Sequence, residues 1–438
     1  MKGRAIKCDA YAAYAACVAG ALLVCVLLGC SKQEEFKSET LTFGSHLSGL
    51  PVTGIVQSLT ADFERETGIK IDFQISPDSL WRSIIQTKLD AGDAPDIFCA
   101  DTPVNLVSSL HVENYCVPLT DEEWVSRLDE NVLPAVSAAG DVYGITFAGK
   151  KMYFFIYNKE LFEKAGADVP TNYSELKVTC QKLKDIGVTP MFEGTRNGWH
   201  QVLPLFETGG LYLEQDPQLY EKLNANEVDL DDIPELLEII REIKECWDLG
   251  FFSGDATSRA VEDAKEAFYF GKCAMFIGEI AWIQEVKSSF PEFDESKAGI
   301  FVMPWGGNQV IGVNPASNAL FISKTSPHIE EAKEFFAFLA RKENLTKRLE
   351  GEPRLSELCW PEIHGGYSDE VQQFLDSLPK ASVVQIAVNY IDNQWMDIGK
   401  DIENMFKGSL TPEDVLELMM SRRREQAIAG GDAGWASQ

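Results

Sequence analysis

Aromatic, carboxylate and amide side chains gather in two short polar segments of this chain. Arg196, Asn197 and Trp199 lie in a polar loop after an expected strand, and Glu279 and Trp282 lie in a second short segment that follows Gly278. The flat face of a Trp ring packs on the C–H side of a sugar ring, and planar polar groups exchange paired hydrogen bonds with hydroxyls. The residue types therefore suit a neutral, polyhydroxylated ligand.

Three more residues are candidates for the same kind of site. Asp101 comes directly after an apolar strand, His46 closes the first expected strand, and Trp395 lies in a late helix. Each has a structural alternative. Asp101 could cap a segment that starts at Pro103, His46 could be a bystander, and Trp395 could belong to the apolar stripe of its own helix. Core packing is also the alternative for the two other tryptophans.

Local signatures of an enzyme are absent from the sequence. It contains no Gly-x-Ser-x-Gly elbow, no His-Glu-x-x-His pair and no Walker-type loop. No group of His and Cys residues suggests a metal site. We therefore expect a protein that is not an enzyme and that uses neither a cofactor nor a metal. A secreted hydrolase with a carboxylate pair stays open, because the separation of such a pair is set in three dimensions.

The elements that must position these residues alternate between strand and helix. Strands are expected at 41–44, 69–75 and 96–100, with helices between them that carry Val56, Leu59 and Phe63 in one case and Trp81 in the other. This order is typical of an α/β protein whose parallel sheet is covered on both faces. Ligands of such sheets bind at the carboxyl ends of the strands.

Later segments continue the α/β pattern. A strand is expected at 152–157, and helices are expected to start near residues 172, 234, 326 and 411, with a further helix over 391–406.

The N-terminal segment has the three-part pattern of a secretory signal. Basic residues precede an apolar run over 10–28, and the run closes with Leu27, Leu28, Gly29 and Cys30. This ending resembles the lipobox of bacterial lipoproteins, in which the Cys is diacylated and the signal is removed. The resemblance implies a signal peptide over 1–29, a tether over 30–39 and a lipid anchor on Cys30. An ordinary signal peptide or a single membrane span is the alternative.

The composition excludes several classes of protein. The chain has 438 residues, of which 45% are hydrophobic, so it is long enough for two lobes and too apolar for a disordered chain. Its formal net charge of -29 argues against nucleic acid or anionic lipid as the main partner.

Six cysteines follow the N-terminal segment, and they are widely spaced. They could form three disulfides in an oxidising compartment. Three of them lie inside apolar segments, where free Cys behaves as a small core residue, so we expect buried free thiols. The six are Cys99, Cys116, Cys180, Cys246, Cys273 and Cys359.

Four blocks, in order along the chain, resemble the family 1 extracellular solute-binding proteins, the carbohydrate-type receptors of ABC importers that include the maltose-binding protein. The first is Gly-Asp-Ala-Pro-Asp-Ile-Phe at 92–98. The second couples Val-Tyr-Gly-Ile at 142–145 to Tyr-Asn-Lys-Glu-Leu-Phe-Glu-Lys-Ala-Gly at 157–166. The third is Phe-Tyr-Phe-Gly-Lys-Cys-Ala-Met-Phe at 268–276, and the fourth is Ala-Lys-Glu-Phe-Phe-Ala-Phe-Leu at 332–339.

The resemblance implies a two-lobed α/β clamp of the periplasmic-binding-protein type (type II). Several crossover segments form its hinge, near residues 147–150, 303–305 and 351–353. Lobe 1 would comprise 40–147 and 306–350, and lobe 2 would comprise 148–305 and 351–438. Arg354, near the third crossover, could reach the cleft or pair with a surface acid.

The resemblance also implies a function. It implies a lipid-anchored, extracytoplasmic receptor on a bacterial membrane, which captures a sugar or oligosaccharide between its lobes. The partners would be the permease subunits of an ABC importer and, through them, the ATPase. Members of the family often have Trp two residues after Gly278, and here that position is Ile280. The same receptor could instead carry a polyamine, a phosphoester, a metal or a peptide.

Overall fold

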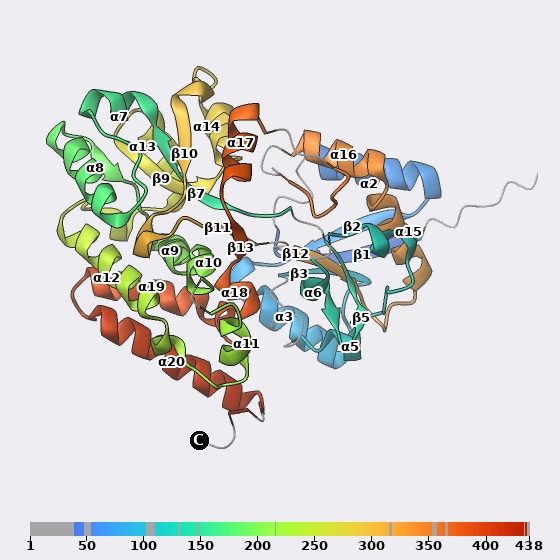
Figure 1. Ribbon diagram of the computed structural model, residues 1–438. Helices are drawn as coiled ribbons and strands as arrows, with labels where there is room; N and C mark the ends of the chain where they lie inside the picture. The colour runs from blue at the N-terminus through green and yellow to red at the C-terminus, as the bar shows by residue number, and fades with distance from the viewer. Residues whose placement is uncertain are drawn as a thin grey trace, which may run out of the picture.

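The computed structural model describes residues 39–47, 54–101, 110–129, 132–146, 149–214, 216–314, 318–352, 357–363, 367–432 and 434–435. These residues form two α/β lobes side by side, which the chain joins by crossing between them more than once (Figure 1). The expected signal peptide, the anchor at Cys30, the tether as far as residue 38 and Arg354 lie outside the described residues.

The sheet of lobe 1 has the strand order β2-β1-β3-β12-β6. Its first three strands are parallel, as the alternation of strand and helix predicts, whereas β12 is antiparallel to both β3 and β6. The five strands are β1 (Thr40–Ser45), β2 (Lys70–Ile75), β3 (Ile97–Asp101), β6 (Gly144–Thr146) and β12 (Asn318–Ile322).

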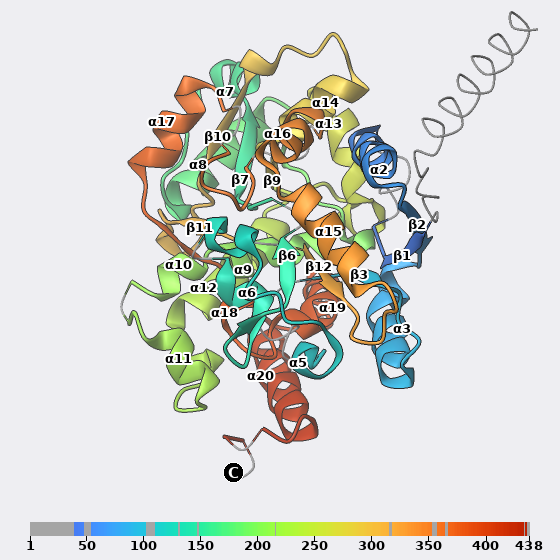
Figure 2. The same cartoon turned by 90° about the vertical axis from the view of Figure 1, so that its right-hand side faces the viewer.

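Both faces of this sheet are buried, because successive side chains of its strands point to opposite sides. On β3, Ile97 and Cys99 pack into one apolar cluster, and Phe98 and Ala100 pack into another. The first cluster contains α2, α15 and α16, which lie together on one side of the lobe (Figure 2), and the second contains α3. The helices are α2 (Gly54–Thr67), α3 (Asp78–Ala91), α5 (Val112–Tyr115), α6 (Leu133–Val136), α15 (Ile329–Leu339) and α16 (Lys342–Gly351).

The sheet of lobe 2 has the strand order β10-β7-β9-β8. Strand β9 is parallel to β8 and antiparallel to β7, and β7 is antiparallel to β10. The carboxyl ends of β8 and β9 therefore lie at the same edge as the start of β7. The strands are β7 (Tyr153–Asn158), β8 (Thr189–Met191), β9 (Cys273–Glu279) and β10 (Ala298–Phe301).

Helices surround the sheet of lobe 2. Several begin at the caps that the sequence predicts: the Asn172 side chain accepts from the Glu175 amide, and Thr411 forms a capping box with Asp414. The helices are α7 (Lys159–Ala165), α8 (Tyr173–Asp185), α9 (Leu203–Glu207), α10 (Gly209–Tyr212), α11 (Leu219–Asn224), α12 (Pro234–Asp248), α13 (Ala264–Tyr269), α14 (Trp282–Ser289), α17 (Asp369–Ser377), α18 (Val384–Ala387), α19 (Trp395–Phe406) and α20 (Pro412–Ala429).

Two helix starts differ from the sequence-based expectation. Helix α15 begins at Ile329 rather than near residue 326, because the Ser326 hydroxyl donates to buried Asp96 and accepts from the amide of His328. The late helix expected over 391–406 is divided, with a short 3-10 turn, η9 (Asp392–Gln394), before α19.

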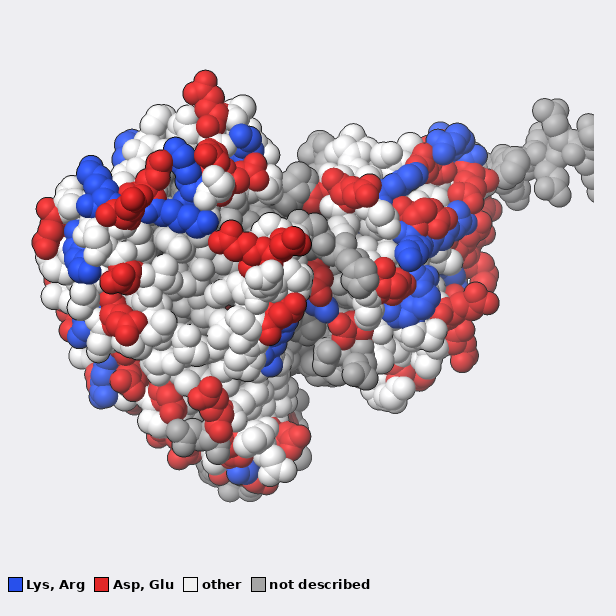
Figure 3. Space-filling model, turned by 45° about the horizontal axis from the view of Figure 1, so that its top comes forward, with Lys and Arg blue, Asp and Glu red and all other residues white. Residues whose placement is uncertain are grey.

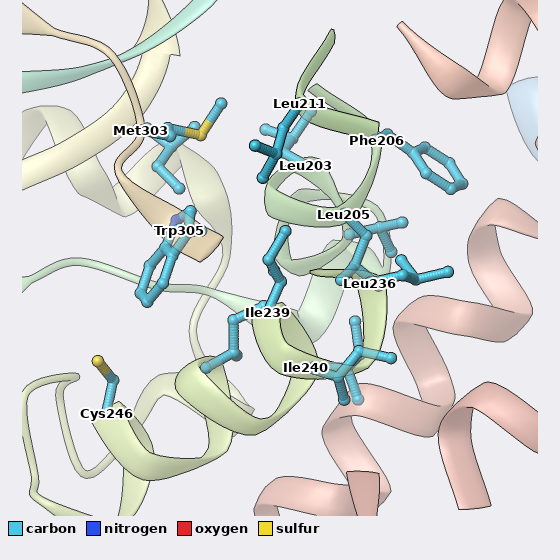
Figure 4. Close-up of a cluster of buried hydrophobic side chains, with 14 of the residues drawn as sticks. Leu203, Leu205, Phe206, Leu211, Leu236, Ile239, Ile240, Cys246, Met303 and Trp305 are labelled. Carbon is cyan, nitrogen blue, oxygen red and sulfur yellow. The ribbon is translucent and has the colours of Figure 1, made fainter. Parts of the chain in front are cut away.

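Two short strands lie in the crossover segments between the lobes. Strands β11 (Ile311–Val313) and β13 (Lys380–Ser382) pair in parallel, and Lys151 forms an isolated bridge with Asn314. The segment that leads into β11 packs on lobe 2: Met303 and Trp305 lie against Leu203, Leu211 and Ile239 (Figure 4). We propose that the second crossover lies after residue 310, later than expected.

The segment after α16 belongs with lobe 1. Leu358, Trp360 and Ile363 pack with residues of α2 and α15 in the same apolar cluster. We propose that the third crossover begins after Ile363 rather than at residue 351. The six cysteines of the described chain are buried and form no disulfide, which confirms the expectation of core thiols. No helix among the described residues is long and apolar enough to cross a membrane.

Candidate functional site

The polar loop after β8 is held by a buried acid–imidazole pair. The ring of His200 contacts the Glu193 carboxylate through Nδ1 and the carbonyl of Ile277 through Nε2, at 2.8 Å each, and it stacks on Phe276. Burial opposes the charged form of His200, but the Glu193 carboxylate outweighs it and raises the pKa of His200. This pair fixes the position of Trp199, the residue next to it in the chain.

Trp199 and Trp395 lie together at one end of lobe 2. The indole nitrogen of Trp395 donates to the carbonyl oxygen of Trp199 at 2.8 Å. Both side chains are half-buried, and the ring of Trp395 meets Phe206 edge to face. Part of the Trp395 ring is therefore packed and part is accessible, so the position is compatible with both of the roles that its sequence allows. Met396, beside it, is 57% exposed.

The two polar candidates of the same loop differ in their surroundings. Asn197 is engaged in holding the loop, because its Oδ1 accepts from the amide of Val261 and its Nδ2 donates to Glu262. Arg196 has an exposed side chain. Of the two, Arg196 is the better placed to meet a ligand.

The two candidate residues after β9 have different surroundings, because Trp282 lies in the core and Glu279 lies near the hinge. Trp282 is buried against Phe268 and Phe276, which supports the alternative of core packing. Glu279 is half-buried, and its Oε1 lies 3.9 Å from the Nζ of Lys151 in the first crossover. Sequence reasoning missed Lys151, although its place just before β7 puts it at the same sheet edge as the end of β9.

The facing part of lobe 1 carries the other two candidates. His46 lies at the end of β1, 6.4 Å from the ring of Trp81 in α3. Asp101 ends β3 opposite Asn318 of β12. The segments that follow these two strands, 48–53 and 102–109, lie outside the described residues.

The two lobes meet where α3 approaches η9. The guanidinium of Arg82 donates to the Oδ1 of Asn393 at 3.1 Å, and Asn393 lies two residues before Trp395. The sequence offers no signal for this contact, because the two residues are 311 positions apart. The contact places α3 of lobe 1 beside the tryptophan pair of lobe 2.

A cavity of about 880 Å³ also opens between the lobes. Thr346 and Leu349 of α16 line its lobe 1 side, and Ile280, Ala281 and Ile300 line its lobe 2 side. Ile280 faces this space, so the position where the family often has Trp does lie between the lobes. The remaining candidates do not line it. Figure 3 shows that the surface is hollowed between the two lobes and that acidic side chains lie beside this hollow.

One group of possible metal ligands occurs among the described residues. Glu39, His328 and Glu331 have ligand atoms within 4.8 Å of one another, at half-buried positions. They lie near the start of β1, at the opposite end of that strand from His46, and so they are not part of the cleft between the lobes.

Comparisons with known proteins agree with the fold. The family model described as bacterial extracellular solute-binding protein matches residues 51–345. The melibiose/raffinose/stachyose-binding protein MelE of Bacillus subtilis is 23% identical over 94% of this chain and 96% of its own length. A putative binding protein of Brucella abortus is 27% identical over 64% of this chain and 67% of its own length.

Solved structures show the same fold at low sequence identity. A chitin oligosaccharide binding protein superposes with a TM-score of 0.75 at 18% identity, over 89% of this chain and 98% of its own. A sugar transporter protein from Bacillus licheniformis in complex with stachyose has a TM-score of 0.69 at 21% identity, over 88% of this chain and 99% of its own. With its family model matched over most of the chain, this protein belongs to the bacterial extracellular solute-binding proteins, a family of binding proteins and not of enzymes.

Proposed function

We propose that this protein captures a sugar or oligosaccharide between its lobes and delivers it to the permease of an ABC importer. The observation that carries the proposal is the pair of half-buried tryptophans, Trp199 and Trp395, which the fold brings together from segments 196 residues apart. They lie beside the contact between α3 and η9, where a bound ring would touch both lobes. Two of the relatives support a sugar: one is named as a melibiose/raffinose/stachyose-binding protein, and the other was solved in complex with stachyose.

The cavity beside Ile280 measures about 880 Å³, within the range of about 300–1,000 Å³ that is common for small-molecule sites, but none of the candidate residues lines it. We therefore place the sugar at the tryptophan pair and not in this cavity. We propose that Trp199, Trp395, Arg196 and Glu279 contact the ligand, together with groups at the ends of β1 and β3.

A titration with a panel of sugars tests this proposal. Intrinsic Trp fluorescence and melting temperature are followed as melibiose, raffinose, stachyose and chitin oligosaccharides are added to the folded protein. Binding to a closed state raises the melting temperature by mass action. At least one neutral oligosaccharide should shift both signals. If no sugar shifts either signal, the cargo is of another class, and the family assignment stands unaffected.

The same titration at two salt concentrations separates the cargo classes. Acidic side chains, among them Glu350 and Glu370, line the cavity. A cationic cargo that pairs with them would bind more weakly as salt increases, since salt screens exposed charge pairs. Binding of a neutral sugar should not depend on salt. A polyamine or a basic peptide that binds with a steep salt dependence, in the absence of any sugar response, would replace the sugar in this proposal.

We also propose that the protein is held on a membrane by acyl chains on Cys30. The pattern of basic residues, apolar run and Leu27–Cys30 supports the anchor, and its two acyl chains would bind a bilayer stably where one would not. The mass of the mature N-terminal peptide from bacterial membranes tests it. A diacylated peptide starting at Cys30 is expected, and it should disappear in C30A. An unmodified peptide cleaved elsewhere contradicts the anchor.

A further inference from the structure

A buried acid and a buried amide join lobe 2 to the segment that returns from the third crossover. Glu207 ends α9, and Gln385 lies in α18, directly after β13. Their side chains are 2% and 1% exposed. The Nε2 of Gln385 donates to the Oε1 of Glu207 at 2.9 Å. The contact joins residues 178 positions apart, so it is a tertiary link and not a local turn.

The second atom of each group also needs a partner. The Oε2 of Glu207 and the Oε1 of Gln385 are both buried, and neither has a hydrogen-bond partner in the described part of the chain. Both atoms are acceptors if Glu207 is ionised, so they cannot bond to each other. A single proton on Glu207 converts one acceptor into a donor and can satisfy both atoms at once. Unsatisfied buried polar atoms are costly, which favours the protonated form.

We infer that Glu207 is protonated in the folded protein and forms with Gln385 a pair of antiparallel hydrogen bonds, which clips the third crossover onto lobe 2. In this pair the amide donates to one carboxyl oxygen and the carboxyl O–H donates to the amide oxygen. The clip goes beyond the proposed function and does not depend on which solute is bound.

The backbone around the clip is tightly packed against both late crossovers. A Cβ on Gly312 of β11 would stand 2.1 Å from the carbonyl oxygen of Glu207, and a Cβ on Gly209 would stand 2.6 Å from the amide nitrogen of Val384. Strands β11 and β13 also pair with each other. The end of α9 therefore touches β11, and the start of α10 touches α18, the helix that follows β13, so a change in the clip reaches the segments that connect the lobes.

The charges around Glu207 agree with a neutral carboxyl at neutral pH. Burial is the main influence and raises the pKa of Glu207 to about 8, and the Gln385 hydrogen bond opposes it. The Glu279 carboxylate raises this pKa further, and Lys151 lowers it. Besides burial, a charge on Glu207 would also raise the pKa of Tyr153 in β7.

Other charged groups on the elements packed against α9 have partners of their own. On η3 (His200–Val202), His200 pairs with Glu193. On β13, Lys380 lies 3.7 Å from Asp376. On α12, Glu242 accepts from the amide of Gly306. The charged partners of His200 and Lys380 compensate those two groups, whereas burial raises the pKa of Glu242 to about 7, so Glu242 is the group that has to be removed in a control variant.

Hydrogen exchange of the amides in 380–388 tests the clip. In the wild type, protection corrected for intrinsic exchange should fall between about pH 4.5 and about pH 8, by up to about tenfold per pH unit, and should level off above about pH 8, because the closed state holds the proton that the open state has already lost. The variant E207Q replaces the acid by an amide that makes the same two hydrogen bonds without a proton, so its protection should not change with pH. The variant E242Q, which changes another buried carboxyl, should keep the wild-type loss.

The outcomes separate clearly. Protection in the wild type that does not depend on pH, or an E207Q variant that loses protection as the wild type does, overturns the inference. If E207Q does not fold, infrared spectra of E242Q at neutral pH replace it. A protonated carboxyl stretch that disappears above about pH 9 supports the clip, and its absence at neutral pH overturns it.

Discussion

At the residue scale, the proposed sugar site depends on side chains that are packed on one side and accessible on the other. Trp395 is anchored by its indole N–H on Trp199 and by the edge of Phe206, yet it is only half-buried. An anchored ring loses little side-chain entropy when a ligand packs on it, and this favours binding. By contrast, Trp282 is enclosed by aromatic rings, so it stabilises lobe 2 from within.

The substitution W395F should weaken sugar binding more than it weakens the fold. It removes the hydrogen bond to Trp199 and part of the accessible ring, which is expected to lower affinity about tenfold, or about 1.4 kcal/mol. Isothermal titration with the sugar that responds in the panel measures this. W247F is the matched control, because Trp247 is also half-buried but stacks on Phe406 away from the cleft. Equal affinities for the two variants would remove Trp395 from the site.

Glu242 should make stability fall as pH rises towards neutrality. Burial raises the pKa of Glu242 from 4.5 to about 7, although the amide of Gly306 donates to its carboxylate. The folded protein thus holds this proton more tightly than the unfolded chain does. Its stabilising contribution is complete below about pH 4.5 and disappears as pH rises through about 7.

Urea unfolding of E242Q at several pH values checks this. A glutamine keeps the hydrogen bond from Gly306 and has no proton to lose, so the gap between E242Q and the wild type should widen by about 2 kcal/mol from acidic to neutral pH. E221Q, at an exposed position on α11, should follow the wild type. A gap that stays constant with pH would contradict a buried, protonated Glu242.

At the element scale, local signals in the sequence predict elements better than they predict contacts between them. The capping residue of α8 and the capping box of α20 occur where the sequence places them, because a cap needs only residues within one turn. The buried Arg423 of α20 could not be foreseen. It donates to the carbonyls of Asn389 and Leu223 and lies over the ring of Trp435, and these partners come from three separate segments.

Removing the cap of α20 should lower stability without changing the site. In T411A the amide of Asp414 loses its acceptor and the helix N-terminus loses half of its capping box, at a cost of about 1 kcal/mol. Thermal unfolding should show a lower melting temperature, with sugar affinity preserved. S421A, on the exposed face of the same helix, serves as the control and should melt close to the wild type. A T411A variant with the wild-type melting temperature would show that the cap contributes little.

At the scale of the whole molecule, the bond between Arg82 and Asn393 is a link across the lobes. It joins α3 of lobe 1 to η9 of lobe 2 beside the tryptophan pair. A link of this kind favours the arrangement in which the lobes are close, by about 1 kcal/mol for one hydrogen bond.

The variant N393A should therefore populate more open shapes in the absence of sugar. Small-angle scattering is expected to give a larger radius of gyration than that of the wild type, and sugar affinity should fall by less than about tenfold. K88A changes a residue on α3 whose partner, Asp93, belongs to lobe 1, so it should leave both quantities unchanged. A compact N393A protein with wild-type affinity would show that the link does not bias the lobes.

The sequence predicts the α/β class, the parallel strands of lobe 1 and most helices, because periodicity and caps are local. It also identifies Trp199 and Trp395 as candidates, although not that one anchors the other. It could not reveal Lys151 beside Glu279 or the acid–amide pair of Glu207, since these contacts depend on how the crossover segments pack. The positions of the crossovers themselves follow from core packing, which no local pattern records.

The strand order of lobe 1 has a consequence for how this chain is synthesised. Strand β12 lies between β3 and β6, so β6 has no partner in that sheet until residues 318–322 have left the ribosome. The apolar cluster on the α2 side of this sheet also includes Trp360, so it cannot be completed before that residue is synthesised. Since domains fold as units, lobe 1 stays incomplete while all of β7 to β11 is being made. In a chain truncated before residue 318, neither lobe is complete. The apolar faces of both sheets should therefore stay exposed, and chaperones should capture the chain.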